Sequence, residues 1–165
     1  MNIIILMSRI AGYTGASRMA LTGAMLAYEV IARYFFIMPT TWAAELSQLC
    51  LIWGCLLAMP YVLATRHHIT VNAVTNLLTP PVQRLCVAVA LLWIIAFSVI
   101  VTLWGWEIFF DSFSRGRTTG SLLNMPVWIS ELAVPVGFAL LTLQATAELI
   151  TLRHTHLASL GSSHE

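Results

Sequence analysis

Residues 82–110 read VQRLCVAVALLWIIAFSVIVTLWGWEIFF and form the longest apolar stretch of the chain. The charged residues of this stretch, Arg84 and Glu107, stand close to its two ends. A helix needs about 20 apolar residues to cross the ~30 Å hydrocarbon core of a bilayer. The stretch exceeds that length, which favours a helix that crosses with some tilt. The sequence therefore predicts a membrane-spanning helix here.

The chain holds three further stretches of this kind, at residues 19–38, 42–65 and 127–152. Of all 165 residues, 59% are hydrophobic and 9% are charged, whereas soluble domains carry about 25% charged residues. So few charges cannot cover a water-soluble surface. We therefore predict an all-α integral membrane protein with four transmembrane helices in residues 1–152. Residues 153–165 would form a short cytoplasmic tail.

Prolines and polar residues mark the expected helix ends. Pro39 is expected to stop the first helix, which could start earlier than residue 19, near Ile10. Thr40 or Thr41 could cap the second helix. Pro126 is expected to open the fourth helix after a polar loop at residues 112–125. The N-terminal stretch has no basic segment before its first apolar residues, so we do not expect a signal peptide.

Residues 69–78 connect the second and third predicted spans. Val71, Val74, Leu77 and Leu78 recur at helical spacing within this segment. That spacing predicts a short amphipathic helix lying in the membrane interface. An irregular loop is the alternative.

Arginines are distributed unequally between the two sides of the predicted membrane domain. With four spans, both termini lie on one side, and that side holds Arg9, Arg18, Arg66, Arg84 and Arg153. The other side holds Arg33, Arg115 and Arg117. Because cytoplasmic segments carry the excess of basic residues, we predict that both termini are cytoplasmic. The predicted interfacial anchors on the opposite side are Trp42, Trp104, Trp106 and Trp128.

Glu29 and Arg33 stand four residues apart in the first predicted span, on one helical face. Glu29 precedes Pro39 by about ten residues, or ~15 Å of helix, which would place its carboxylate deep in the bilayer. We interpret Glu29 as a structural partner of Arg33 or of a neighbouring helix. A proton-binding or substrate-binding carboxylate is the alternative. Glu45 opens the second span, and an interhelical Arg33–Glu45 pair is a further hypothesis.

The remaining chemistry-bearing residues indicate neither an enzyme nor a cofactor site. Glu107 and Asp111 are expected to form a solvated charge cluster with the nearby arginines, and Glu131 is expected to cap or pair at the interface. All five histidines lie outside the predicted spans, which argues against haem. The chain has no metal-ligand spacing and no hydrolase or ATPase motif. The net charge of +1 does not favour a nucleic-acid partner.

Several short motifs occur in order along the chain. They are Arg33-Tyr34 with Pro39, Trp42 and Glu45; then Trp53; RHHITV at 66–71; Pro80 through Arg84; residues 122–128; and PVGF at 135–138. Over residues 27–149 the chain resembles the small membrane subunit of tripartite ATP-independent periplasmic (TRAP) transporters, the DctQ-like small permeases. Three positions depart from the family pattern: Ala44 where a second acid is frequent, Asn72 where Asp is usual, and Glu29 where a neutral polar residue is common.

The resemblance implies an accessory subunit in the bacterial inner membrane. Its partners would be a large multi-span transport subunit and a periplasmic substrate-binding protein, in sodium-coupled uptake of an organic acid such as a C4-dicarboxylate, a sugar acid or sialic acid. No cofactor is implied. The candidate structural or partner-contact residues are Glu29, Arg33, Trp42, Glu45, Trp53, Arg66, His68, Arg84, Pro126 and Trp128.

Two other functions compete with this interpretation. A small four-helix proton-coupled exporter could use Glu29, although the loops at 69–78 and 112–125 are long for such a protein. A membrane anchor of a respiratory complex is disfavoured by the absence of histidines within the spans. For the accessory subunit, the face that carries Trp42 and Trp53, together with the first span, is predicted to contact the partner.

Overall fold

The computed structural model describes residues 2–38, 40–65, 80–121 and 123–154. Four helices cover most of them: α1 (Asn2–Phe35), α2 (Ala43–Ala64), α4 (Pro80–Arg115) and α5 (Trp128–His154). The predicted all-α class is confirmed for these residues. The predicted amphipathic helix at 69–78 lies outside the described residues, as do Pro39 and residues 155–165 of the tail.

Three of these helices are long and apolar enough to cross a membrane. The qualifying segments are Ala43–Ala64, Leu85–Arg115 and Trp128–Thr151. The helix α1 is not among them, although its 34 residues correspond to ~51 Å of helix. Its charged side chains, including Glu29 and Arg33, dilute its apolar character. A crossing by α1 therefore stays a prediction.

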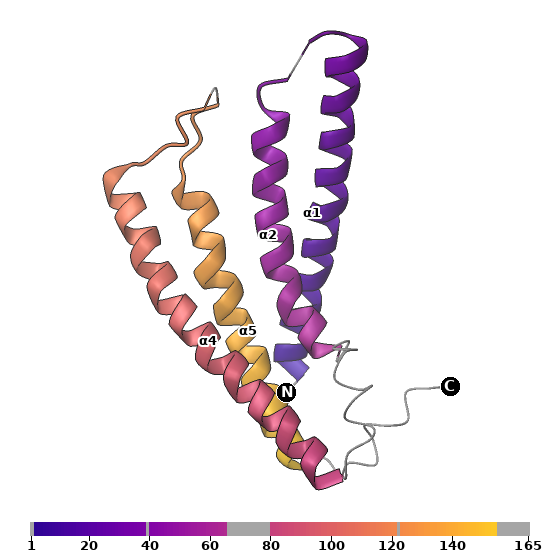
Figure 1. Cartoon of the computed structure of the whole chain (residues 1–165), viewed down its shortest axis with the longest axis vertical. Helices are drawn as coiled ribbons and strands as arrows, with labels where there is room; N and C mark the ends of the chain where they lie inside the picture. Colours follow the sequence, from indigo (N-terminus) through magenta and orange to yellow (C-terminus); the bar gives the residue numbers. More distant parts are fainter. Residues whose placement is uncertain (1, 39, 66–79, 122, 155–165) are drawn as a thin grey trace.

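The helices form two antiparallel hairpins that pack side by side. Across the view of Figure 1 they follow the order α4, α5, α2, α1, and α2 packs against α5. The connections at residues 36–42 and 116–127 lie at one end of the molecule, here called the loop end. The start of α1 and the end of α5 lie at the other end, here called the terminal end.

The helix boundaries differ from the sequence prediction at the loop between α4 and α5. The helix α4 continues to Arg115, so Ser112 is fully buried inside a helix instead of opening a loop. Pro126 does not open α5, because it forms an isolated antiparallel bridge with Thr118 two residues before the helix starts. The flanking hydrogen bond from the Val127 N–H to the Arg117 carbonyl holds Pro126 in this small hairpin.

The start of α2 also differs from the prediction. Trp42, and neither threonine, is the residue before the helix, and its side chain makes no capping hydrogen bond. Thr40 donates instead to a carboxylate of α1. The sequence predicted that Thr40 or Thr41 caps α2, whereas in the structure Thr40 connects the start of α2 to α1.

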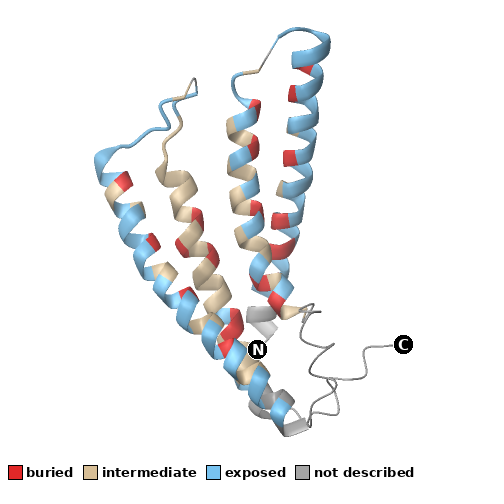
Figure 2. Ribbon diagram, in the orientation of Figure 1, coloured by how far each residue is buried: buried red, intermediate tan, exposed pale blue. Residues whose placement is uncertain are grey.

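Close packing between the helices depends on glycine. A Cβ atom on Gly15 of α1 would lie 2.8 Å from the carbonyl oxygen of Gly54 in α2, and one on Gly137 of α5 would lie 2.8 Å from Leu56 Cβ in α2. Small residues let membrane helices approach to backbone contact. In Figure 2 buried residues lie on the sides of α1 and α2 that face each other. The largest fully buried side chains are Gln144, Pro60, Ser98 and Ser112.

The terminal end holds a small core and a buried polar contact. Leu63 of α2, Leu91 of α4 and Ala145 of α5 form the core cluster. Beside it, Ser8 Oγ of α1 donates to Gln144 Oε1 of α5 over 2.7 Å, and both residues are buried. A polar pair that is satisfied inside the packing ties the first helix to the last.

Candidate functional site

Glu29 is the one charged residue that is buried among the described residues. Its side chain is 7% exposed, and its Oε1 accepts from Arg33 Nη2 over 2.7 Å. Its Oε2 accepts from the Thr40 N–H over 3.1 Å and from the Thr40 hydroxyl. The carboxylate thus has three donors from its own chain. Such a site holds the α1–α2 connection in place.

The contact with Thr40 adds a partner of Glu29 that the sequence analysis did not expect. Counting back along the helix from Pro39 had placed the carboxylate deep in the bilayer. The chain folds back after Phe35, so Thr40 returns beside Glu29 just before α2 begins. Glu29 therefore lies level with the start of α2 and binds the connection as well as Arg33, while its depth in the bilayer stays a prediction.

The hypothesised Arg33–Glu45 pair is absent from the described residues. Arg33 binds Glu29 on its own helix, and Glu45 Oε1 accepts from the Leu123 N–H over 3.5 Å. The Oε2 atom of Glu45 is buried without a hydrogen-bond partner. Because α1 extends past the start of α2, Arg33 lies closer to Glu29, one turn earlier on its own helix, than to Glu45 on α2.

The two tryptophans of the α1–α2 hairpin make contacts inside the chain. Trp42 stacks on Tyr28 of α1, with ring centroids 6.1 Å apart. Trp53 Nε1 donates to the Ile129 carbonyl of α5 over 3.1 Å, and the Arg18 guanidinium lies 5.7 Å from the Trp53 ring centroid. Trp53 thus joins α1, α2 and α5. Its partners come from two other helices, so the sequence could not identify them.

The loop end of the second hairpin combines aromatic packing with ion pairs. Trp128 packs edge-on against Phe109 and Phe113 of α4. Asp111 Oδ1 binds Arg115 Nε over 2.6 Å, and Asp111 Oδ2 binds Arg117 Nη2 over 3.1 Å. The predicted charge cluster is present for Asp111.

Two predicted acids have other surroundings. Glu107 and Asp111 line a surface hollow together with neighbouring α4 residues, and the hollow is open to the outside of that helix. Glu131 stands in the first turn of α5, where its Oε2 is buried without a hydrogen-bond partner. The predicted capping or pairing of Glu131 is therefore not seen at this oxygen.

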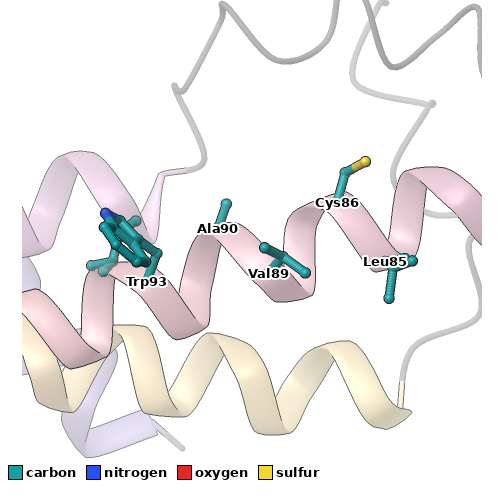
Figure 3. A pocket seen from close by; sticks show the side chains of 6 residues that line it. Leu85, Cys86, Val89, Ala90 and Trp93 are labelled. Carbon is teal, nitrogen blue, oxygen red and sulfur yellow. The ribbon is translucent and has the colours of Figure 1, made fainter.

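A second surface hollow lies near the other end of α4. Leu85, Cys86, Val89, Ala90, Trp93 and Ile94 line it. In Figure 3 the labelled side chains, Leu85 to Trp93, all project from α4. The lining of the hollow is almost entirely apolar, and Cys86 is its one titratable side chain. The described residues also hold no group of three or more His, Cys, Asp or Glu side chains that could bind a metal.

Comparison with known families identifies the relationship. The family model described as "Tripartite ATP-independent periplasmic transporters, DctQ component" matches residues 22–155. The chain belongs to this family. The matched DctQ region contains α2, α4, α5 and the second part of α1, so the apolar helices are those of a multi-pass inner-membrane protein of a transport system.

One relative extends this comparison. The chain is 25% identical over 127 residues to the C4-dicarboxylate TRAP transporter small permease protein DctQ of Pseudomonas aeruginosa. The alignment covers 76% of this chain and 60% of the relative. All ten candidate residues of the sequence analysis fall within the DctQ match, whereas Ser8 and Gly15, which the sequence analysis did not select, precede it.

Three candidate residues remain without a described environment. Arg66 and His68 lie outside the described residues. Arg84 lies in the second turn of α4, and its side chain is not described. For these DctQ-family positions, a structural or partner-contact role stays a prediction.

Proposed function

We propose that this DctQ-family chain is the small permease subunit of a TRAP-type secondary transporter. It assembles with a large membrane subunit that moves the substrate and with a periplasmic binding protein that delivers it. The transport is sodium-coupled uptake of an organic acid such as a C4-dicarboxylate. Family membership and the name of the Pseudomonas relative support this assignment.

The packing of the helices carries the accessory role. The described helices meet through glycine, alanine and serine, and Gly15 and Gly137 bring neighbouring helices into near-backbone contact. The polar contacts between helices, such as Ser8–Gln144 and Trp53–Ile129, are separate pairs, each satisfied locally. A substrate route needs space and a continuous polar lining. The two surface hollows of the described residues are each lined by α4 alone and do not lie between helices, which supports a bracing subunit.

The contacts of Glu29 give no support to the exporter alternative. A proton-coupling carboxylate must exchange its proton and its ligand during each cycle. Glu29 is buried and holds three donors from Arg33 and Thr40. Its removal would loosen a turn, and it would not remove a transport step.

We further propose that the chain crosses the membrane four times with both termini in the cytoplasm. The antiparallel hairpins support this, since both connections lie at the loop end. The helix α1 has the length to cross. A membrane-impermeant thiol reagent on intact spheroplasts should label a cysteine at Thr119 and spare one at Met1. The opposite pattern would refute the orientation.

Reconstitution tests the proposed function. The chain, the large subunit from the same genome and the binding protein are purified, and uptake of labelled succinate, a sugar acid and sialic acid is measured in proteoliposomes. Uptake of one substrate should require all three proteins and an inward sodium gradient, with a potassium gradient as the control. Uptake or efflux by this chain alone would overturn the proposal. A failure to co-purify with the large subunit would do the same.

A further inference from the structure

Arg18 of α1 lies beside the middle of α2. A Cβ atom on Gly54 would come within 3.5 Å of Arg18 Cβ, and Gly54 is the twelfth of the 22 residues of α2. The helix α2 is long and apolar enough to cross a membrane, so each of its ends lies ~15 Å of helix away from this contact. In the proposed membrane arrangement, the charge of Arg18 is therefore close to the centre of the bilayer.

This position changes one term in the prediction of orientation. That prediction counted Arg18 with the arginines outside the spans, on the side of the termini. Without Arg18 that side keeps four of its five arginines, against three on the other side. The excess of basic residues still favours cytoplasmic termini.

The guanidinium of Arg18 stays at this depth. Its Cζ lies 5.7 Å from the ring centroid of Trp53, which directly precedes Gly54 in the middle of α2. Long basic side chains reach the headgroups from positions near helix ends. Arg18 packs about ten residues from either end of α2, so a lipid phosphate does not meet its charge.

The chain supplies no acceptor for Arg18. Among the described residues, its guanidinium takes part in no ion pair, whereas the arginines near the loop end bind carboxylates. The nitrogen atoms of Arg18 are not among the buried atoms that lack a partner, so they are accessible from outside the chain. The Trp53 ring covers one face of the guanidinium. The N–H groups point outward in its plane and fit a carboxylate, which accepts from two of them at once.

The depth of Arg18 narrows the source of that carboxylate. A second copy of this chain in the same orientation does not match it, because Arg18 lies 16 residues from the nearer end of α1, whereas the described acids lie within eight residues of an end of their own helices. Neither surface hollow of the described residues includes Arg18, so a free substrate anion has no site there. An acidic side chain on a membrane helix of another protein remains, and the large subunit is the membrane partner in the proposed function.

We propose that Arg18 docks this chain onto the large membrane subunit by pairing, in the middle of the bilayer, with a carboxylate on a transmembrane helix of that subunit. The proposal rests on the proposed function, because it needs that partner. An unpaired charge is costly in lipid, so each of the two charges favours assembly and disfavours a partner that lacks the other. Arg18 precedes the DctQ match at residues 22–155, so the pair concerns this chain and its own large subunit.

Binding measurements on variants that change this one charge test the docking role. The labelled full chain is titrated with the large subunit from the same genome in mixed lipid–detergent micelles. The dissociation constant is measured for wild type, Arg18→Gln and Arg18→Lys. The matched control is Arg9→Gln, which makes the same chemical change at an exposed position of the same helix. The Tm of each chain alone separates loss of the Trp53 contact from loss of the partner.

Arg18→Gln should raise the dissociation constant at least about tenfold. Arg18→Lys should raise it less, because lysine keeps the charge without the two parallel hydrogen bonds, and Arg9→Gln should leave it unchanged. The Asp and Glu residues within the membrane helices of the large subunit are then replaced singly by Asn or Gln. One of these changes should weaken binding of the wild-type chain and have no further effect on Arg18→Gln.

Equal binding by wild type and Arg18→Gln would overturn the proposal. A loss of binding on Arg18→Gln that couples to no acid of the large subunit would overturn it as well, since Arg18 would then act only through the packing of its own chain. If Arg18→Gln does not fold alone, the same cycle is measured with Arg18→Lys. A wild-type chain that does not bind the large subunit would overturn the proposed function itself, so the two failures are distinguishable.

Discussion

Two glycines of α1 provide the sharpest test of the packing. A Cβ atom on Gly15 would lie 2.8 Å from the Gly54 carbonyl oxygen and 3.2 Å from the Ala58 backbone nitrogen. Both contacts are with backbone, so neither partner can rotate away. A Cβ atom on Gly23, in the same helix, would meet no atom within 4 Å. Alanine at the two positions should therefore have opposite effects on stability.

The magnitudes follow from two opposing terms. Alanine in place of glycine favours a helix by about 0.5–1 kcal/mol, and this term applies at both positions. Overpacking at a tight contact costs about 1–3 kcal/mol, and this term applies only at Gly15. We expect Gly23→Ala to raise the free energy of unfolding and Gly15→Ala to lower it, with a difference of about 2 kcal/mol between the variants. For a chain of this size the difference corresponds to about 4–8 °C in Tm.

Thermal unfolding of the purified chain in one detergent measures this difference, with near-ultraviolet circular dichroism of the tryptophans as the signal. Both variants carry the same chemical change in the same helix, so each is the control for the other. If both melting temperatures moved in the same direction by the same amount, the close approach of α1 and α2 at Gly15 would be refuted.

Three further substitutions probe other contacts by the same melting assay. Trp53→Phe removes the donor to the Ile129 carbonyl and should cost about 0.5–1.5 kcal/mol; an unchanged Tm would contradict the α2–α5 contact. Ser8→Ala and Gln144→Leu, alone and combined, should show a coupling of about 0.6 kcal/mol, and additive effects would mean that the two do not bond. Asp111→Asn breaks two exposed ion pairs and should change stability by less than about 1 kcal/mol; a larger loss would show a role beyond these pairs.

The sequence was most informative where composition changes abruptly. The second predicted span, 42–65, differs from α2 by one residue at each end. Polar residues flank that apolar run on both sides, so its ends can be located from the sequence alone. The helix α1 begins at Asn2, before both the predicted span start at residue 19 and the alternative helical start near residue 10, because Arg9 and Arg18 interrupt the apolar pattern. The first turns of α1 contact other helices, for example through the hydrogen bond from Ser8 to Gln144. Contacts between residues so far apart in the chain cannot be predicted from the local sequence.

The candidate site was predictable only in its local part. The Glu29–Arg33 pair follows from a spacing of four residues on one helix, and it is present. The contact of Glu29 with Thr40 depends on the path of the turn, and the contact of Trp53 with Ile129 depends on which hairpin faces which. Spacing along one helix contains neither kind of information, so both were missed.

The position of Glu29 shows why this matters for function. Counting residues from Pro39 took no account of the path of the turn, so Arg33 or a neighbouring helix was the expected partner of Glu29 in the bilayer. Such a group would need a proton or a partner, and this requirement was the attraction of the exporter hypothesis. In the structure the turn folds back and supplies the donors itself. The Glu29 carboxylate already accepts hydrogen bonds from Arg33 and Thr40, so it does not need a bound proton to be stable where it lies. The same contacts that hold the turn therefore remove the feature of Glu29 that favoured the exporter hypothesis.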